Sequence, residues 1–148
     1  MIKVLFICHG NICRSPMAEF VMKELVRQQG REDEFYIASA ATSTEEIGNG
    51  VYPPVRKLLR AHGMDCGGKT ARQMTAADYD AFDLLIGMDE ANVRNMKRIC
   101  GGDRDGKIKM LLDYTDHPCA VADPWYTRDF EATWPDVNDG CRGLLRQL

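Results

Sequence analysis

The feature of this sequence that most restricts its fold is a short apolar run near the N-terminus, residues 3–7, which ends at a polar loop. An unbroken run of this length, without alternating polar residues, is typical of a strand covered on both faces, as in a parallel sheet. A helix signal follows at once. Ser15 is placed to cap a helix, Pro16 suits its first position, and an apolar stripe extends as far as Gly30. The sequence therefore predicts a buried strand, a loop and a helix in direct succession.

Strand and helix signals alternate along the rest of the chain. The expected segments are strands at residues 34–40, 83–88 and 107–112 and helices at residues 53–62, 89–100 and 129–148. This alternation predicts an α/β fold, with residues 1–148 forming a single three-layer domain around a central four-stranded parallel sheet flanked by helices. Ligands bind such sheets at the carboxyl ends of the strands, so the loop after the first strand is the expected binding site.

Composition excludes several classes of function. The 148 residues carry 19 Lys and Arg against 22 Asp and Glu, a net charge of −3, with the two signs interspersed, so no nucleic-acid partner is expected. The longest apolar run, at residues 4–8, is too short for a membrane span, and no secretory signal pattern is present, so we expect no membrane partner and a cytoplasmic location. The 6 cysteines are then expected to be free thiols.

The loop after the first strand has the sequence Cys-His-Gly-Asn-Ile-Cys-Arg-Ser. It leads into a helix N-terminus, whose backbone N–H groups and dipole favour a bound anion, so it is a candidate phosphate-binding loop. The same dipoles and the cationic Arg14 would stabilise a thiolate on Cys8, to which Ser15 can donate a hydrogen bond. Arg14 also offers a planar fork for two phosphoryl oxygens, Gly10 allows close backbone approach, and Asn11 tolerates a left-handed turn. These residue types predict attack of a thiolate on phosphorus.

A lone cysteine at a strand end is more often a small buried hydrophobic residue, but Arg six positions later, followed by Ser, favours the catalytic interpretation. Attack on the phosphorus of an ester also calls for a group that gives a proton to the leaving oxygen. Asp123, followed by Pro-Trp-Tyr, offers an acid on a proline-stiffened loop beside two aromatic residues. Asp116, before His-Pro, is a second candidate, and an Asp before Pro is also a common turn residue.

With these residues in place, the sequence resembles the low-molecular-weight protein tyrosine phosphatases. Their signature, C-x5-R-S directly after the first strand, stands here between Cys8 and Ser15 and continues as Pro-Met-Ala-Glu. The resemblance covers nearly the whole chain, with similar segments at residues 39–48, 71–73, 82–83, 88–90 and 123–124. It implies hydrolysis of phosphotyrosine through a phosphocysteine on Cys8, with Arg14 as phosphate clamp and no metal or cofactor.

The resemblance also implies roles for further residues. The family places its general acid and base in a late Asp-Pro followed by two aromatic residues, which matches Asp123 and not Asp116. The residues implied in substrate binding are His9, Gly10, Asn11, Ile12, Cys13, Trp125 and Tyr126. Ser15 and Ser39 are implied as supporting residues. The expected partners are phosphotyrosine-containing proteins, and inorganic phosphate is expected both as product and as competitive ligand.

Three positions depart from the family pattern or refine it. Lys69 stands where many members carry a His that helps to hold the loop Asn, so we expect Asn11 to be held differently, with help from Ser39. Glu45 stands where relatives of eukaryotic type have an aromatic pocket wall. Ile12 favours phosphotyrosine, because the similar protein-arginine phosphatases carry Thr at that position.

Several alternatives stay open. A protein-arginine phosphatase or an arsenate reductase would share the fold, although Cys66 and Cys100 lack the close spacing of an arsenate reductase relay. The family also implies a reversible disulfide between Cys8 and Cys13, for which loop packing is an equally good explanation of Cys13. From other classes, residues 63–70 match the nucleotide-binding pattern G-x-x-x-x-G-K-S/T, but a helix rather than a strand precedes them. A phosphotyrosine-binding module without turnover is the remaining possibility.

Overall fold

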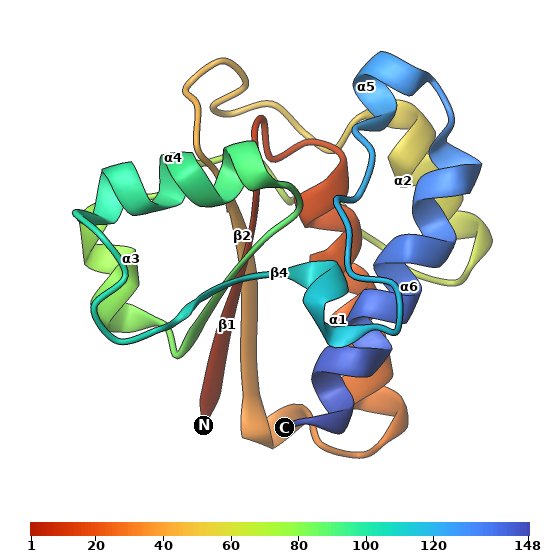
Figure 1. Cartoon of the computed structure of the whole chain (residues 1–148). Coiled ribbons are helices and arrows are strands. Elements are labelled where there is room, and N and C mark those ends of the chain that lie inside the picture. Colours follow the sequence, from red (N-terminus) through yellow and green to blue (C-terminus); the bar gives the residue numbers. More distant parts are fainter.

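The protein is a four-stranded parallel sheet with helices on both faces, as the computed structural model in Figure 1 shows. The structure describes residues 1–124 and 127–148 in full, and residues 125 and 126 by their backbone only. The strands are β1 (Ile2–Cys8), β2 (Phe35–Ala41), β3 (Leu84–Gly87) and β4 (Ile108–Met110). Their spatial order is β2-β1-β3-β4, so the first strand lies inside the sheet. The predicted α/β class and four-stranded parallel sheet are confirmed.

Side chains of β1 alternate between two hydrophobic cores. Val4 and Phe6 belong to the core on one face, and Leu5 and Ile7 to the core on the other, and all four have no exposed surface. Burial on both faces explains why residues 4–7 are all apolar.

Helices of the first face surround the larger core: α1 (Arg14–Gln28), α2 (Pro53–Ala61) and α6 (Phe130–Arg146). The second face is covered by α3 (Ala76–Ala81) and α4 (Glu90–Cys100). The remaining short elements are η1 (Glu32–Glu34), η2 (Leu111–Tyr114) and α5 (Pro124–Thr127). Among the residues that the structure describes, no helix has the length and apolar character needed to cross a membrane.

Helix α6 lies close against the η2 turn, and two glycines make this approach possible. A Cβ atom at Gly140 would overlap the Leu111 side chain, and one at Gly143 would overlap the Tyr114 carbonyl oxygen. Helix α6 also packs along α1. The C-terminal helix is thereby fixed to the same helix that begins at the candidate phosphate-binding loop.

Helix starts agree with the sequence in two cases and differ in a third. Asp89 accepts the Asn92 N–H at 2.7 Å and so caps α4, and Asp129 accepts the Ala132 N–H at 3.0 Å and caps α6. The prediction that Ser15 caps α1 is wrong. Helix α1 begins at Arg14 and has no side-chain cap, because the Ser15 hydroxyl is hydrogen-bonded within the loop.

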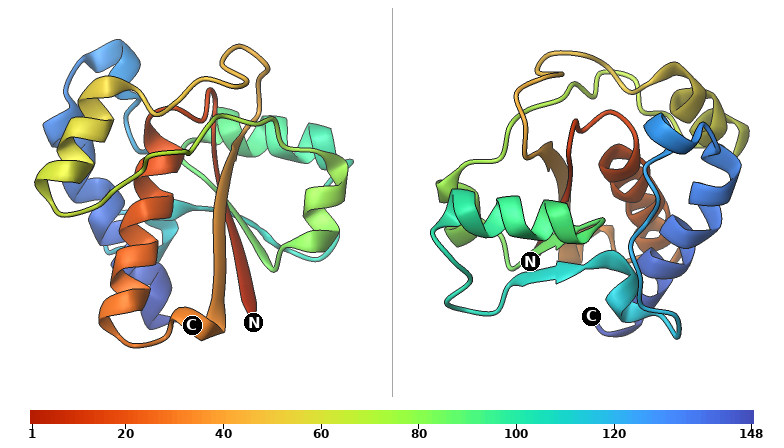
Figure 2. Two further views of the ribbon diagram at one scale, coloured as in Figure 1. Left: turned by 180° about the vertical axis from the view of Figure 1, so that it is seen from behind. Right: turned by 45° about the horizontal axis from the view of Figure 1, so that its top comes forward.

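The strand ends place the candidate site at one end of the molecule. Ile7 of β1 lies opposite Gly87 of β3, and Cys8 opposite Ala41 of β2, so three strands end at the same edge. The loop after β1, the segment after β2 and α5 come together at this end, and both termini lie at the opposite end (Figures 1 and 2).

Candidate active site

Cys8 is the last residue of β1 and has a nearly buried side chain. Its Sγ accepts the Asn11 backbone N–H at 3.3 Å and lies 3.1 Å from the Ser15 hydroxyl oxygen. Asn11 has a φ of 59°, in the left-handed region that Asn tolerates better than most residues. This turn directs the Asn11 N–H back toward the sulfur, so loop conformation and the environment of Cys8 are directly linked.

The buried Asn11 side chain holds the turn in place. Its Nδ2 donates to the Ser15 Oγ at 2.8 Å and to the Ser39 Oγ at 2.9 Å, and its Oδ1 accepts the Arg72 N–H at 3.3 Å. Because the Ser15 oxygen accepts from Asn11, the Ser15 proton is available to donate to Cys8. The network therefore places a hydroxyl donor within hydrogen-bond distance of the sulfur.

An ion pair between Lys69 and the buried Glu19 supports Ser39 in turn. The Ser39 hydroxyl donates to Glu19 Oε1 at 2.6 Å, and Lys69 Nζ donates to the Ser39 carbonyl at 2.9 Å and lies 3.5 Å from Glu19 Oε1. Lys23 binds the other Glu19 oxygen at 2.6 Å. Burial lowers the pKa of Lys69, against the opposing effect of Glu19. The lysine of the nucleotide-like motif thus contacts the residues that support the Cys8 loop.

The rest of that motif has an unsuitable setting for nucleotide binding. Residues 63–70 follow helix α2, and Gly63 has a φ of 80° at the turn where the helix stops. The chain beyond them reaches α3 only at Ala76. A phosphate-binding P-loop connects a strand directly to a helix, so the local structure does not supply the required geometry.

Arg14 opens α1 and has a buried guanidinium that is already oriented. Its Nη1 donates to Asp89 Oδ2 at 2.7 Å and to the Val121 carbonyl at 2.9 Å, and its Nη2 donates to Asp123 Oδ2 at 3.4 Å. Burial opposes the charge, but Cys8, Asp89 and Asp123 outweigh it and raise the pKa of Arg14. Because Nη1 uses both of its protons, the Nε and Nη2 edge is the one that suits two phosphoryl oxygens.

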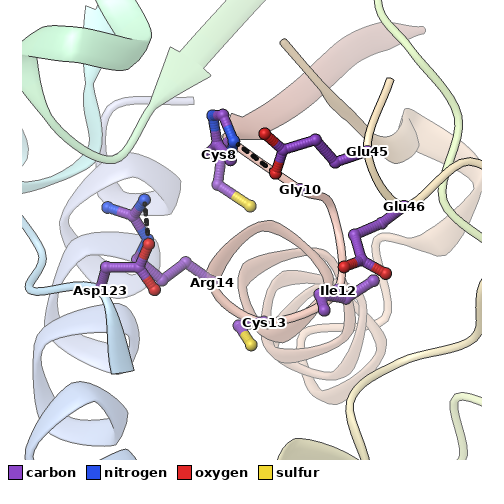
Figure 3. A pocket seen from close by; sticks show the side chains of 9 residues that line it. Cys8, Gly10, Ile12, Cys13, Arg14, Glu45, Glu46 and Asp123 are labelled. Atoms are coloured by element: carbon purple, nitrogen blue, oxygen red, sulfur yellow. Dashed lines mark hydrogen bonds and ion pairs between the residues drawn. The ribbon is translucent and has the colours of Figure 1, made fainter. Parts of the chain in front are cut away.

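A cavity of about 110 Å³ joins these groups (Figure 3). Its lining residues are Cys8, His9, Gly10, Ile12, Cys13, Arg14, Glu45, Glu46 and Asp123. Asp123 lies on the side of Arg14, whereas Glu45 and Glu46 lie across the cavity from it. The structure therefore gathers the proposed nucleophile, clamp and acid around one space, although Asp123 is more than a hundred residues from Cys8 in the sequence.

The remaining predicted site residues have different positions. Asn11 and Ser15 lie beneath the loop, bonded to each other and to Cys8, and Ser39 lies beyond Asn11. Trp125 and Tyr126, the two expected aromatic contacts, lie outside the residues whose side chains the structure describes.

The structure describes all six cysteines as free thiols. Burial, with added effects of Cys8 and Asp123, raises the pKa of the Cys13 thiol to about 12. Cys13 is therefore protonated at neutral pH and a poor nucleophile, although it lines the same cavity as Cys8.

Two residues of this site were not predicted from the sequence. Asp89, which the sequence placed only at the start of the predicted helix at residues 89–100, also orients Arg14, and Glu46 lines the cavity. The position of Asp89 just beyond the carboxyl end of a central strand was the available signal, because such ends meet at the binding edge. Among the described residues, no three His, Cys, Asp or Glu side chains form a group that could hold a metal ion.

Comparison with known proteins places the whole chain in one family. Residues 3–148 match the family of low molecular weight phosphotyrosine protein phosphatases. The low molecular weight protein-tyrosine-phosphatase YfkJ of Bacillus subtilis strain 168 is 38% identical over 150 residues, which cover 100% of this chain and 96% of that protein. The Gallus gallus low molecular weight phosphotyrosine protein phosphatase is 38% identical over 149 residues, 97% of this chain and 94% of that protein.

The solved structures agree with this assignment. The crystal structure of YfkJ from Bacillus subtilis superposes with a TM-score of 0.95 at 39% identity, covering 99% of this chain and 94% of that one. Both relatives are named protein-tyrosine or phosphotyrosine protein phosphatases, which are hydrolases. The chain belongs to the low molecular weight phosphotyrosine protein phosphatase family.

Proposed function

We propose that this chain hydrolyses phosphotyrosine in proteins, with Cys8 as nucleophile, Arg14 as phosphate clamp and Asp123 as general acid and then base. The observation that carries the proposal is the single cavity lined by all three side chains. The family assignment supports the reaction, and the geometry supports the roles of the residues. No step requires a metal or a cofactor.

In the first step, the Cys8 thiolate forms a bond to phosphorus as the bond from phosphorus to the tyrosyl oxygen breaks. Asp123 gives its proton to that oxygen, which leaves as a phenol. Backbone N–H groups of the loop and the Nε and Nη2 edge of Arg14 bind the equatorial oxygens while charge shifts toward them. The donors are in place before substrate arrives, so little reorganisation is needed in the transition state.

In the second step, the Asp123 carboxylate takes a proton from water as the water oxygen bonds to phosphorus and the bond to sulfur breaks. Inorganic phosphate is released and Cys8 returns to the thiolate. The Ser15 hydroxyl and the Asn11 N–H stabilise the sulfur both as nucleophile and as leaving group, because each lies within hydrogen-bond distance of it. Inorganic phosphate is then also a competitive ligand of the same loop.

Three otherwise matched peptides, carrying phosphotyrosine, phosphoserine or phosphoarginine, test this function. We expect the wild-type chain to hydrolyse the phosphotyrosine peptide fastest, with unchanged kcat/KM in the presence of a chelator. Cys8→Ser should lower kcat roughly a thousandfold or more, because the hydroxyl is a far weaker nucleophile, while the peptide still binds.

Undiminished hydrolysis by Cys8→Ser would refute the nucleophile. Faster hydrolysis of the phosphoarginine peptide would replace the proposed substrate with that of the protein-arginine phosphatases. Binding of the phosphotyrosine peptide without any turnover would indicate a recognition module.

A further inference from the structure

Two acidic side chains at the candidate cavity have no part in the mechanism above. Glu45 and Glu46 come from the segment after β2, and both line the cavity that contains Cys8 and Arg14. They face the cavity from the side opposite Asp123 (Figure 3). A substrate whose phosphoryl group reaches Cys8 therefore passes between Asp123 and this pair.

Glu46 lies against the loop and accepts one hydrogen bond. Asn49 Nδ2 donates to its Oε2 at 2.6 Å, and its Cγ lies 3.4 Å from the place that a Cβ on Gly10 would occupy. The carboxylate is also close enough to add to the effects that raise the pKa of Cys13. A charge at this place acts on a bound substrate at close range.

Glu45 forms the more exposed part of the rim. Its Oε2 lies 3.0 Å from His9 Nε2, and the Glu45 and His9 side chains are 67% and 48% exposed. The pair brings together the segment after β2 and the loop after β1. Glu45 is thus positioned where residues next to a bound phosphotyrosine would lie, outside the space for the phosphoryl group.

The charges along the cavity are out of balance. Among the described residues that line it, Arg14 is the one Lys or Arg side chain, and it already contacts Asp89 and Asp123. Glu45 and Glu46 contact no Lys or Arg in the hydrogen bonds and ion pairs of the described part of the chain. A dianionic phosphoryl group must approach this negative rim, and a cation carried by the substrate would offset the repulsion.

We propose that Glu45 and Glu46 are specificity-determining residues that select phosphotyrosine sites with Lys or Arg one or two positions away. The inference rests on the proposed function and names the substrate class within it. The carboxylates lie beside the reacting groups, so a flanking ammonium or guanidinium group reaches them while the phosphoryl group is bound to the loop.

Phosphotyrosine peptides of one length, with Lys, Gln or Glu at the two positions on each side, test the proposal. For the wild type, we expect kcat/KM to be roughly three- to tenfold higher for the Lys peptide than for the Gln peptide, and lowest for the Glu peptide. In the double variant Glu45→Gln/Glu46→Gln, the ratio between the Lys and Glu peptides should fall close to one. High salt should reduce the wild-type ratio, because the rim is exposed.

A matched control removes the same charge elsewhere. Asp33→Asn/Glu34→Gln neutralises two exposed carboxylates at η1. Element η1 lies directly before the first residue of β2, whereas Glu45 and Glu46 follow the last residue of that strand. This variant should keep the wild-type ratio between the Lys and Glu peptides. If it lost the ratio as fully as the Glu45 and Glu46 variant, the preference would come from net charge and the inference would be overturned.

p-Nitrophenyl phosphate separates this inference from the proposed function, because it has no flanking residues. Hydrolysis of this compound with a wild-type peptide ratio near one would overturn the specificity proposal and leave the phosphatase activity intact. Failure to hydrolyse it and all the peptides would overturn the proposed function and the inference with it.

Discussion

Ser15 illustrates how much a single residue's role depends on its neighbours. The sequence predicts two roles for Ser15, a helix cap and a hydrogen-bond donor to Cys8. In the structure its hydroxyl is hydrogen-bonded to Cys8 and Asn11 within the loop and does not cap α1. Cys8, Arg14 and Ser15 could be identified together because they belong to one short loop. The contact between Arg14 and Asp89 could not, because it joins residues 75 positions apart. Side-chain contacts over such separations leave no local pattern.

Asp123 is the residue whose role is best tested by changing the substrate. Asp123→Ala should lower kcat/KM about 100- to 10,000-fold for phenyl phosphates with poor leaving groups, because these need a proton as the bond breaks. Activated esters such as p-nitrophenyl phosphate should be affected much less. The measurement is a series of aryl phosphates that differ in the acidity of the phenol.

Asp116→Ala is the control for this series, because Asp116 is an exposed aspartate near a proline in the same region. It should leave kcat/KM unchanged across the series. An equal loss for all leaving groups in Asp123→Ala would argue against proton donation.

At the scale of elements, the strand, loop and helix at the N-terminus were predictable because three independent signals agree there. Helices α3 and α5 were missed, since segments of 6 and 4 residues are too short to show a 3.6-residue period. The predicted fourth strand is also shorter than expected. β4 ends at Met110, and the apolar residues after it form the η2 turn that packs under α6. Apolar character alone did not distinguish these two conformations.

The connection between α1, β2 and the segment that contains Lys69 leads to a prediction about this lysine. Lys69→Met removes the donor to the Ser39 carbonyl and one cation beside the buried Glu19, so the free energy of unfolding should fall by about 1–3 kcal/mol. The kcat should also fall, because Ser39 helps to hold Asn11. Lys69→Arg should restore part of both losses. Urea unfolding and steady-state kinetics measure them.

Lys57→Met, on the exposed side of α2, is the control and should change neither quantity. If Lys69→Met lowered stability with full kcat, Lys69 would have a purely structural role. If the wild type bound ATP or GTP and Lys69→Met bound the nucleotide less well, residues 63–70 would again be interpreted as a nucleotide-binding motif.

At the scale of the whole molecule, the alternation of strands and helices was sufficient to predict the α/β class. It did not give the strand order β2-β1-β3-β4, which depends on how whole elements pack. The residues of the site also come from separate segments of the chain. Cys8 and Arg14 come from one loop, whereas Asp89, Glu46 and Asp123 are brought to it by the sheet and by the C-terminal segment.

Stability at alkaline pH is a property of the whole core. Cys141 of α6 is fully buried against α1, where its Sγ donates to the Ala18 carbonyl, and burial raises the pKa of this thiol. Above about pH 9, the unfolded chain loses this proton while the folded chain keeps it, so stability should fall as pH rises. In Cys141→Ala, the free energy of unfolding should fall less steeply with pH, by up to about 1.4 kcal/mol per pH unit.

Urea unfolding at pH 8 and pH 10, in reducing conditions, measures the slope, and the exposed Cys119→Ala variant should leave it unchanged. An unaltered slope in Cys141→Ala would mean that other groups control alkaline unfolding.

The close packing of α6 on the η2 turn, which depends on Gly140 and Gly143, has a consequence for how activity is lost on heating. The same C-terminal region carries Asp123, whereas the anion-binding loop is built around β1 and α1. Detachment of the C-terminal region would take both Asp123 and the Val121 carbonyl away from Arg14 and would uncover the side of α1 against which Cys141 packs. On heating, phosphate binding and turnover should therefore be lost together with this packing, because the clamp and the general acid both depend on it.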